Sequence, residues 1–556
     1  MRDFHMSIIF QRLIKSAGLI LIFFAANASA WTNGQNATYV IGQPDFVTGS
    51  SGTSATTLNN PRDAALDIIN QKLYIVDKDN NRVLRFAYPI TSNQPAAELV
   101  FGQPDFVSGS IPASAGQNTF NNPFAITVDA TGRLWVSSED HRVVWFNNAH
   151  MISANQPDAD GVLGQPDFTS STSGVTQNNT FRPMGIDVDA NGVLYVSDTF
   201  NHRVLWFNNA AEKANGADAD GVLGQPDFVT NTATITKSSM NRPVGLRVFG
   251  STLFVGDRSN GRVLRFDNAA FKANGADADA VLGQADFTTN VGTITQSTLE
   301  YPGKMAIDGS GKLYVSDGYN ADRVIIFDNA LSKADGADAD NVIGQFDFTS
   351  SGSDITQNRL NMDSHGGGLA LDSSSNTLLV SDDNNNRIMV FKSTITGPEF
   401  NLKAGANYLP SGSSVDFGKE QSDIIFTIEN PGSLDLVLDG SPKAHITGTN
   451  ADQFLVVTQP TSPITTLSNS TFKVRYQPTV LGAATATITI TNDDSDESSF
   501  MLTLSGNAIT TVDIATNTDT NNSISGGSID FRFSLLIAVG LMLRVLGRRY
   551  VKQNQG

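Results

Sequence analysis

The chain of 556 residues is predicted to be an all-β protein, with a six-bladed β-propeller followed by a small β-sandwich. Two short strings predict the propeller, because each recurs six times at intervals of about sixty residues. The first is Gly-Gln-x-Asp-Phe, which begins at Gly42, Gly102, Gly164, Gly224, Gly283 and Gly344. The second is Arg followed by Val or Ile, at Arg82, Arg142, Arg203, Arg262, Arg323 and Arg387. This periodicity stops after Phe391, which predicts a second domain.

Composition excludes several classes of function. The formal net charge of −18 argues against a nucleic-acid-binding protein, which needs a basic face, and against docking on anionic lipid. The absence of cysteine excludes disulfides, thiolate nucleophiles and zinc–thiolate or iron–sulfur sites. Histidine is scarce, with six in the chain. Sites that need several histidines are therefore disfavoured.

Residues 1–30 are predicted to be a secretory signal peptide. Basic residues at positions 2, 12 and 15 precede an apolar run over 17–26, and Ala28-Ser29-Ala30 is a small-residue cleavage site. An uncleaved membrane anchor is the alternative, but the apolar run is short for a span. Trp31 is the expected first residue of the mature protein, and export is expected.

Each repeat resolves into four short strands, as the third copy illustrates. Residues 185–189, 193–198, 203–207 and 222–228 are rich in β-branched and aromatic residues and are bounded by Asn, Gly and Asp. The first two of these runs are joined by Asn191-Gly192, which is typical of a tight hairpin. Four antiparallel strands in each of six copies are typical of propeller blades.

One string of the third copy carries a family resemblance. Leu194-Tyr195-Val196-Ser197-Asp198 and the following Asn201-His202-Arg203-Val204 resemble the NHL repeat family, and the resemblance extends over about residues 38–392. It implies an NHL-type propeller in which the repeated Asp and Arg are structural. The second copy departs from the pattern, because Ser138 replaces the Asp. The other copies carry Asp77, Asp198, Asp257, Asp317 and Asp382.

The two ends of the repeat region are expected to close the ring. The first Gly-Gln-Pro-Asp-Phe string precedes any complete blade, and the last blade stops at its third strand near Phe391. Residues 38–46 should therefore form the outer strand of blade six, which would remove exposed strand edges. The propeller is assigned to residues 31–396, and a deletion before Phe46 should open it.

Candidate ligand-binding residues lie where each blade begins. Antiparallel strands alternate in direction, so these positions should share a face with the turns between second and third strands, at the mouth of the central channel. Unlike the strand motifs, they differ from blade to blade. They are Asn60, Arg62, Asn122, Phe124, Arg182, Met184, Arg242, Val244, Tyr301, Lys304 and His365. Arg182, Arg242 and Lys304 would form a basic patch for a carboxylate, a uronic sugar or a phosphate. Ordinary solvated rim side chains are the alternative.

Acidic loops are expected on the opposite face. They contain paired aspartates at Asp158 and Asp160, Asp218 and Asp220, Asp277 and Asp279, and Asp338 and Asp340. Calcium takes several oxygen ligands from flexible loops, and the second and third pairs are the candidate metal ligands. Two carboxylates per loop fit a solvated loop better, so no cofactor is expected, and calcium is the alternative.

Residues 397–509 are predicted to form the β-sandwich. Alternating strands are expected at 424–429, 472–476, 484–490 and 502–506. The order F-x-V-x-Y-x-P-T, then Gly482, then A-T-x-T-I-x-N-D resembles immunoglobulin-like modules beside carboxy-terminal anchors in bacterial surface proteins. The resemblance implies a spacer or an adhesive module.

The end of the chain contains a second targeting signal. A Thr/Asn/Ser-rich linker (510–528) leads to a segment (529–556) with a mainly apolar run over 533–543, expected to be a short helix, and trailing arginines. With Gly526-Gly527, this segment resembles the Gly-Gly sorting tails of Gram-negative bacteria, which rhomboid-type proteases process. The resemblance implies a sorting protease as partner and a location at the cell surface or outside. A simple membrane anchor is the alternative.

The preferred interpretation is an exported, non-enzymatic and monomeric binding or scaffold protein whose partner is an extracellular protein, a peptide or a glycan. The alternative is a metal-dependent lyase or hydrolase in the channel. Amidating lyases with NHL-type blades need several inward histidines, and here only His365 is suitably placed. Asp63, Asp187 and Arg247 lie on expected innermost strands, so carboxylate-based metal chemistry stays open.

Overall fold

The computed structural model describes residues 31–393, 397–405, 407–409, 411–430, 432–466, 468–494 and 498–509. The predicted signal peptide, linker and sorting tail lie outside these residues. The described part is built from β-strands with eight single-turn 3₁₀ helices, which confirms the predicted all-β class. Among these residues, no helix has the length and hydropathy that crossing a membrane requires.

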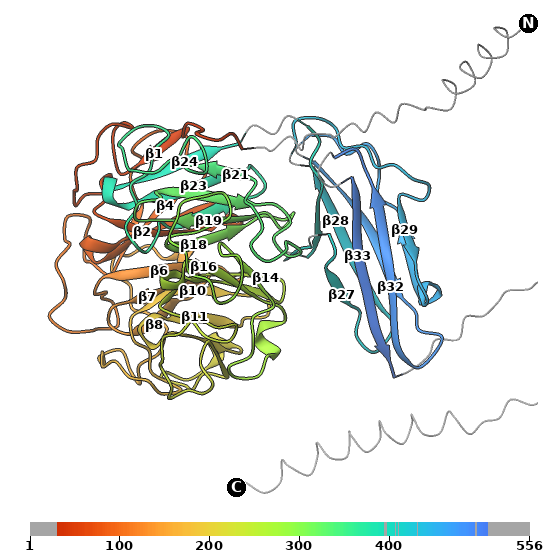
Figure 1. The fold of residues 1–556 in the computed structure, drawn as a ribbon, viewed down its shortest axis with the longest axis horizontal. Coiled ribbons are helices and arrows are strands. Elements are labelled where there is room, and N and C mark those ends of the chain that lie inside the picture. The colour runs from red at the N-terminus through yellow and green to blue at the C-terminus, as the bar shows by residue number, and fades with distance from the viewer. Residues whose placement is uncertain are drawn as a thin grey trace, which may run out of the picture. The chain divides into compact units, whose positions relative to one another are not determined.

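Six four-stranded antiparallel sheets form the blades of the propeller (Figure 1). Blades one and two contain β2 (Pro61–Asp67), β3 (Lys72–Asp77), β4 (Arg82–Ala87), β5 (Leu99–Phe101), β6 (Pro123–Val128), β7 (Leu134–Ser138), β8 (Arg142–Phe146) and β9 (Gly161–Leu163). Blades three and four contain β10 (Pro183–Val188), β11 (Leu194–Asp198), β12 (Arg203–Phe207), β13 (Gly221–Leu223), β14 (Pro243–Phe249), β15 (Thr252–Asp257), β16 (Arg262–Phe266) and β17 (Ala280–Leu282).

Blades five and six contain β18 (Pro302–Ile307), β19 (Leu313–Asp317), β20 (Arg323–Phe327), β21 (Asn341–Ile343), β22 (Leu369–Asp372), β23 (Thr377–Asp382), β24 (Arg387–Lys392) and β1 (Tyr39–Ile41). Helices η1 (Lys78–Asn80), η3 (Thr199–Asn201), η5 (Arg258–Asn260) and η7 (Asp383–Asn385) lie in turns between second and third strands. Helices η2 (Ala149–Met151), η4 (Ala210–Glu212) and η6 (Ala269–Phe271) follow third strands.

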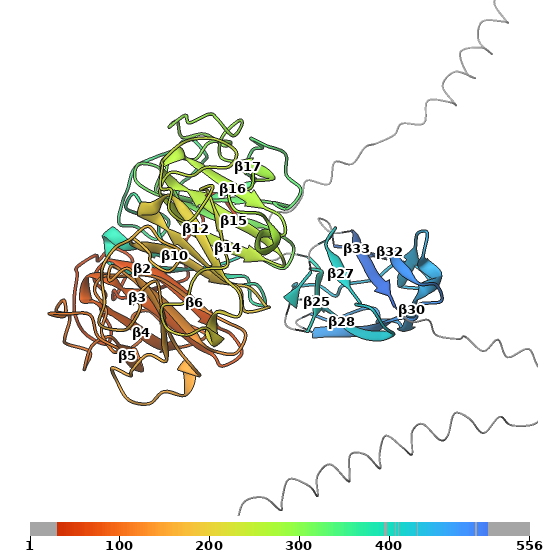
Figure 2. The same ribbon diagram turned by 90° about the horizontal axis from the view of Figure 1, so that it is seen from below.

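The first strands of the blades pack side by side around the central axis, and Figure 2 shows four of them, β2, β6, β10 and β14. The last first strand, β22, packs against β2. Glycines permit this close approach. A Cβ on Gly245 of β14 would lie 1.8 Å from the carbonyl oxygen of Gly303 in β18. Likewise, a Cβ on Gly368, just before β22, would lie 2.4 Å from the Cα of Asp63 in β2. The six sheets therefore form a closed ring.

The N-terminal segment supplies the outer strand of blade six. Strand β1 pairs antiparallel with β24, with Tyr39 opposite Val390. The N-terminal segment already packs against the propeller before β1 begins. Trp31 is 2% exposed, and its Nε1 donates a hydrogen bond to the Tyr314 hydroxyl at 2.8 Å. The Trp31 carbonyl accepts from Asn341 at 3.0 Å. The closing segment is thus anchored to blade five as well as to blade six.

The repeated Asp and Arg form a buried ion pair inside each blade. In blade one, Arg82 Nε lies 2.7 Å from Asp77, and both side chains are fully buried. The same arginine donates to the carbonyl of Phe106, at the end of the Gly-Gln-x-Asp-Phe string, at 2.6 Å. Blade two keeps this arrangement despite Ser138, because Asp140 lies 3.4 Å from Arg142. These residues fasten the turn between second and third strands to the segment that follows the outer strand.

The sandwich consists of two sheets. One has the order β26 (Asn407–Tyr408), β25 (Asn401–Ala404), β28 (Ser422–Asn430), β31 (Ser468–Tyr476), β30 (Phe454–Thr458). The other has the order β27 (Ser414–Asp416), β33 (Ser499–Ala508), β32 (Gly482–Thr491), β29 (Ala444–Thr447); η8 (Ala451–Gln453) precedes β30. Alternate residues of both sheets form one buried core, in which Phe426 and Phe472 stack at 5.1 Å.

Candidate functional site

One face of the propeller carries both the starts of the first strands and the turns between second and third strands, and we call it the mouth face. Hydrogen bonds between neighbouring blades join these two sets. The amide of Arg182 donates to Nδ1 of His141 at 3.2 Å, and the amide of Arg242 donates to Nδ1 of His202 at 3.1 Å. His141 and His202 are therefore links between blades.

The residue before the first proline of blades one to four has a left-handed backbone. Its φ is 56° at Asn60, 43° at Asn122, 50° at Arg182 and 54° at Arg242. Asparagine tolerates this region, whereas a long side chain loses about 1 kcal/mol there. Arginine is thus held at two positions where the backbone favours asparagine.

Arg182 and Arg242 both pack against one aromatic side chain, Phe200, and we call the three residues the Arg–Phe–Arg surface. Their guanidinium carbons lie 5.3 and 5.1 Å from the ring centre of Phe200, in the turn of blade three. Glu139 lies 3.6 Å from Arg182. Arg242 is exposed, and no acidic side chain in the described part of the chain lies within 4.0 Å of it. One guanidinium therefore keeps its donors available for a ligand.

Blade five places a second group of aromatic residues on the mouth face. The guanidinium carbon of Arg258 lies 5.0 Å from the Tyr301 ring centre, and Tyr319 lies 5.3 Å from Tyr301. Tyr319 is 55% exposed and has a φ of 67°. Sequence reasoning selected Tyr301 but missed Tyr319 and Phe200. Both are bulky aromatic residues in a turn between second and third strands, and this unusual placement is the sequence feature that indicates them.

The mouth end of the channel, where the sequence predicts ligand-binding residues, is filled by side chains. Phe124, Met184 and Val244 are buried and pack together beside Phe200. Asn60 and Asn122 stay partly exposed on the rim, where their side chains bind Asp79 and Glu139 at 3.1 Å.

Residues 363–366, which we call the plug, close the rest of this opening. Arg62 of blade one donates to Asp363, and Arg258 of blade four donates to Ser364. The His365 ring lies 6.0 Å from that of Phe124 in blade two. The plug is thus held by three blades besides its own, and the predicted residues Arg62 and His365 help to close the opening.

Asp363 and His365 of the plug share a hydrogen bond. Burial alone would raise the pKa of Asp363, but hydrogen bonds from His365 and Arg62 hold it well below its usual range. Burial lowers the pKa of His365, although Asp363 opposes this shift. His365 is therefore a neutral partner of a charged carboxylate near pH 7.

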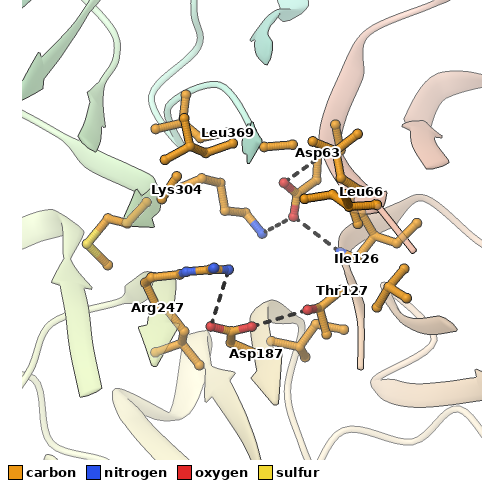
Figure 3. Close-up of a pocket in the computed structure, with 18 residues that line it drawn as sticks. Asp63, Leu66, Ile126, Thr127, Asp187, Arg247, Lys304 and Leu369 are labelled. Carbon is orange, nitrogen blue, oxygen red and sulfur yellow. Dashed lines mark hydrogen bonds and ion pairs between the residues drawn. The ribbon is translucent and has the colours of Figure 1, made fainter. Parts of the chain in front are cut away.

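A cavity of about 190 Å³ lies in the channel, beyond the plug (Figure 3). Its lining comes from the first strands of all six blades, mainly from the halves that lead toward the opposite face. Two ion pairs face it: Lys304 Nζ lies 2.7 Å from Asp63, and Arg247 lies 3.7 Å from Asp187. Lys304 thus points into the channel and does not extend the basic patch that the sequence predicts with Arg182 and Arg242.

The cavity is poorly suited to a divalent cation. Asp63 and Asp187 each already face a cationic side chain, which would repel a metal ion. Within the described ranges, no three His, Cys, Asp or Glu side chains are grouped so that they could hold a metal.

The second aspartate of each candidate acidic loop is held by a backbone amide and a lysine. Asp220 accepts from the Asn208 amide at 2.7 Å and lies 3.0 Å from Lys213. Asp279 accepts from the Asp267 amide at 2.8 Å and lies 2.9 Å from Lys272. Their loop partners are Asp218 and Asp277. The calcium hypothesis for these four residues gains no support from this geometry.

No protein-family model matches the chain, and no curated protein is similar to it. Among solved structures, one similar chain is a structural genomics protein of unknown function from Bacteroides thetaiotaomicron. It shares 14% identity and a TM-score of 0.40, covering 64% of this chain and 75% of that one.

Proposed function

We propose that this protein is an exported, non-catalytic binding protein that uses the Arg–Phe–Arg surface to bind an anionic ligand. The observation that carries the proposal is the left-handed backbone at Arg182 and Arg242. Strain retained against the local preference for asparagine is a feature of functional positions. If these two positions were only solvated rim positions, asparagine would suit them as well as it suits the equivalent positions of blades one and two.

The side chains favour a carboxylate-bearing glycan as the ligand. A guanidinium group binds a carboxylate through two parallel hydrogen bonds, and Arg242 has its donors available. The exposed ring of Tyr319 offers a flat apolar surface, and aromatic rings of this kind can pack against a sugar ring. An acidic peptide or a phosphate shares only the first of these two features.

The remaining parts of the chain fit such a role. We propose that the blades are NHL repeats, that the sandwich is an immunoglobulin-like spacer, and that the C-terminal segment is a sorting tail handled by a membrane protease. Together with the N-terminal export signal, these parts would place the propeller at the surface of a Gram-negative bacterium or outside it.

The channel offers a weaker case for the alternative, a metal-dependent lyase or hydrolase. Lys304 and Arg247 neutralise the carboxylates that such an enzyme would use. His365 is engaged with Asp363 in the plug and is not directed at the cavity lining.

The test is a titration of the full chain with an oligogalacturonate, a polymer of uronic acid. The variant Arg182→Asn/Arg242→Asn copies the residues of blades one and two and removes both charges. Binding should weaken by roughly a hundredfold, because two charge-assisted contacts are lost. The unfolding temperature should stay the same or rise slightly, because the backbone strain is relieved.

Three further titrations complete the design. A neutral oligosaccharide of equal length should not bind, and poly-glutamate should bind more weakly than the oligogalacturonate. A matched surface variant, Lys213→Ala, should bind like the unmodified protein. Unchanged affinity in the double asparagine variant would contradict the proposal, and so would a failure of the unmodified protein to bind the oligogalacturonate.

A further inference from the structure

The cavity in the channel has more hydrogen-bond donors than acceptors. Asp187 accepts from the amides of Val188 and Val248, at 3.0 and 2.8 Å, and from the Thr127 hydroxyl at 3.1 Å. Both of its oxygens therefore have partners before Arg247 is counted. Arg247 approaches it only to 3.7 Å, beyond hydrogen-bonding distance, and its Nε is buried without a partner.

The second ion pair shows the same imbalance. Asp63 accepts from the amides of Ala64 and Ile126 at 3.0 and 3.2 Å, and from Lys304 at 2.7 Å. An ammonium group has three donors, and among the described residues this carboxylate is the one acceptor within hydrogen-bonding distance of Lys304. Both carboxylates are satisfied, while both cations keep donors to spare.

Lys304 and Arg247 come from neighbouring strands, β18 and β14, and both point into the cavity (Figure 3). Each cation is paired with a carboxylate, so it is the unused donors of Lys304 and Arg247, and not a net positive charge, that favour an anionic acceptor between them. Much of the remaining lining is aliphatic: Leu66, Ile126, Ile186, Leu246, Met305 and Leu369. The cavity thus combines one anion-binding end with an apolar remainder.

We propose that this cavity binds a short-chain aliphatic monocarboxylate, with the carboxylate bridging Lys304 and Arg247 and the carbon chain against the aliphatic side chains. The volume of about 190 Å³ lies below the range of pockets for drug-sized ligands, so the acid should have only a few carbons. This site is separate from the Arg–Phe–Arg surface, because the plug and the buried Phe124, Met184 and Val244 lie between them.

The experiment is isothermal titration calorimetry of the full chain with isobutyrate and with isobutyramide, its uncharged isostere. Isobutyrate should bind at least roughly tenfold more tightly, because only the acid supplies a charged acceptor. Arg247→Ala should weaken isobutyrate binding by roughly tenfold or more. Three other blades have alanine at the position equivalent to Arg247: Ala65, Ala306 and Ala370. The Arg247 side chain is also 38% exposed. The Arg247→Ala variant should therefore fold.

A second variant tests the other cation. Asp63→Asn/Lys304→Met removes the buried pair together, which avoids leaving one charge unpaired. It should also lose isobutyrate binding, whereas Arg182→Asn/Arg242→Asn should keep it. Equal affinities for acid and amide would overturn the proposal. So would isobutyrate binding that survives Arg247→Ala, or no heat of binding up to about 10 mM isobutyrate.

Discussion

At the scale of single residues, the last residue of the turn between second and third strands accepts a hydrogen bond from a backbone amide of the next blade. Five blades use side chains of three different chemical types for this link. Asn81 and Asn386 each accept a hydrogen bond from a backbone amide of the next blade through the side-chain oxygen, at 2.9 Å. Asp322 accepts the corresponding bond through its carboxylate. His141 and His202 use Nδ1, which can accept a hydrogen bond only while it carries no proton. Two links between blades therefore depend on neutral imidazoles.

This dependence predicts a loss of stability in mild acid. Burial lowers the pKa of His141 and His202, and the charges of Arg182 and Arg242 lower it further. The unfolded chain therefore binds protons more tightly at these sites than the folded protein does. Their contribution to stability is present above a pH of about 6.5 and is lost as the pH falls through the lowered values.

Urea unfolding measured between pH 7.5 and 5 checks this prediction. His141→Asn/His202→Asn, which copies Asn81 and Asn386, should show a smaller loss of unfolding free energy over this range than the unmodified protein. An identical pH dependence in the two proteins would mean that the imidazoles are not the acid-sensitive links.

The repeated ion pairs should differ in strength between blades. Asp257 lies 2.8 Å from Arg262 and both are fully buried, so Asp257→Ala should cost about 3–5 kcal/mol of unfolding free energy. Asp140 makes the corresponding contact in blade two at 3.4 Å, so Asp140→Ala should cost less. Equal losses in the two variants, measured by denaturant unfolding, would contradict this ranking.

The repeated residues could be interpreted from the sequence because six copies of the Arg and the Gln, and five of the Asp, indicate a shared structural role. The mouth residues could be placed on one face by strand direction alone. Their burial could not be predicted, because it depends on the plug, which is an irregular connection without a counterpart in other blades. Lys304 illustrates this point: its position in the repeat is that of a mouth residue, yet its side chain enters the channel.

At the scale of elements, the N-terminal segment supplies more than a strand. Asn33 accepts the amide of Val342 at 3.0 Å, as Asn215 accepts the amide of Val162 at 3.1 Å. The segment from Trp31 onward therefore plays the part of the loop that precedes every other outer strand. The sequence predicts a strand over 38–46, whereas β1 covers only Tyr39–Ile41, because Gly42 has a φ of 90° and ends the strand. The buried Trp31 has no repeated equivalent and is not among the predicted residues.

This anchoring predicts a large effect at the first described residue. Trp31→Ala should lower the unfolding free energy by about 3–5 kcal/mol, because it empties a buried aromatic site against Tyr314. Trp31→Phe keeps apolar volume and loses the hydrogen bond to the Tyr314 hydroxyl, so it should cost less. Thermal unfolding of the two variants gives the comparison, and an unchanged midpoint in Trp31→Ala would show that the segment is not needed for ring closure.

At the scale of the whole molecule, similar blades present a dissimilar mouth face. The framework of every blade repeats, while blades three, four and five carry Arg182, Phe200, Arg242, Arg258 and Tyr319 on that face. The chain as a whole has a net charge of −18, which repels anions at long range. An anionic ligand would therefore bind only where cationic side chains are concentrated, and this local concentration is what we propose as the binding surface.

The most direct measurement is hydrogen exchange of the full chain with and without a saturating oligogalacturonate. Exchange should slow in the segments that contain Arg182, Phe200 and Arg242, with little change in the acidic loops around Asp218 and Asp277. Protection centred on those loops or on the sandwich, with the segments of blades three and four unchanged, would contradict this prediction.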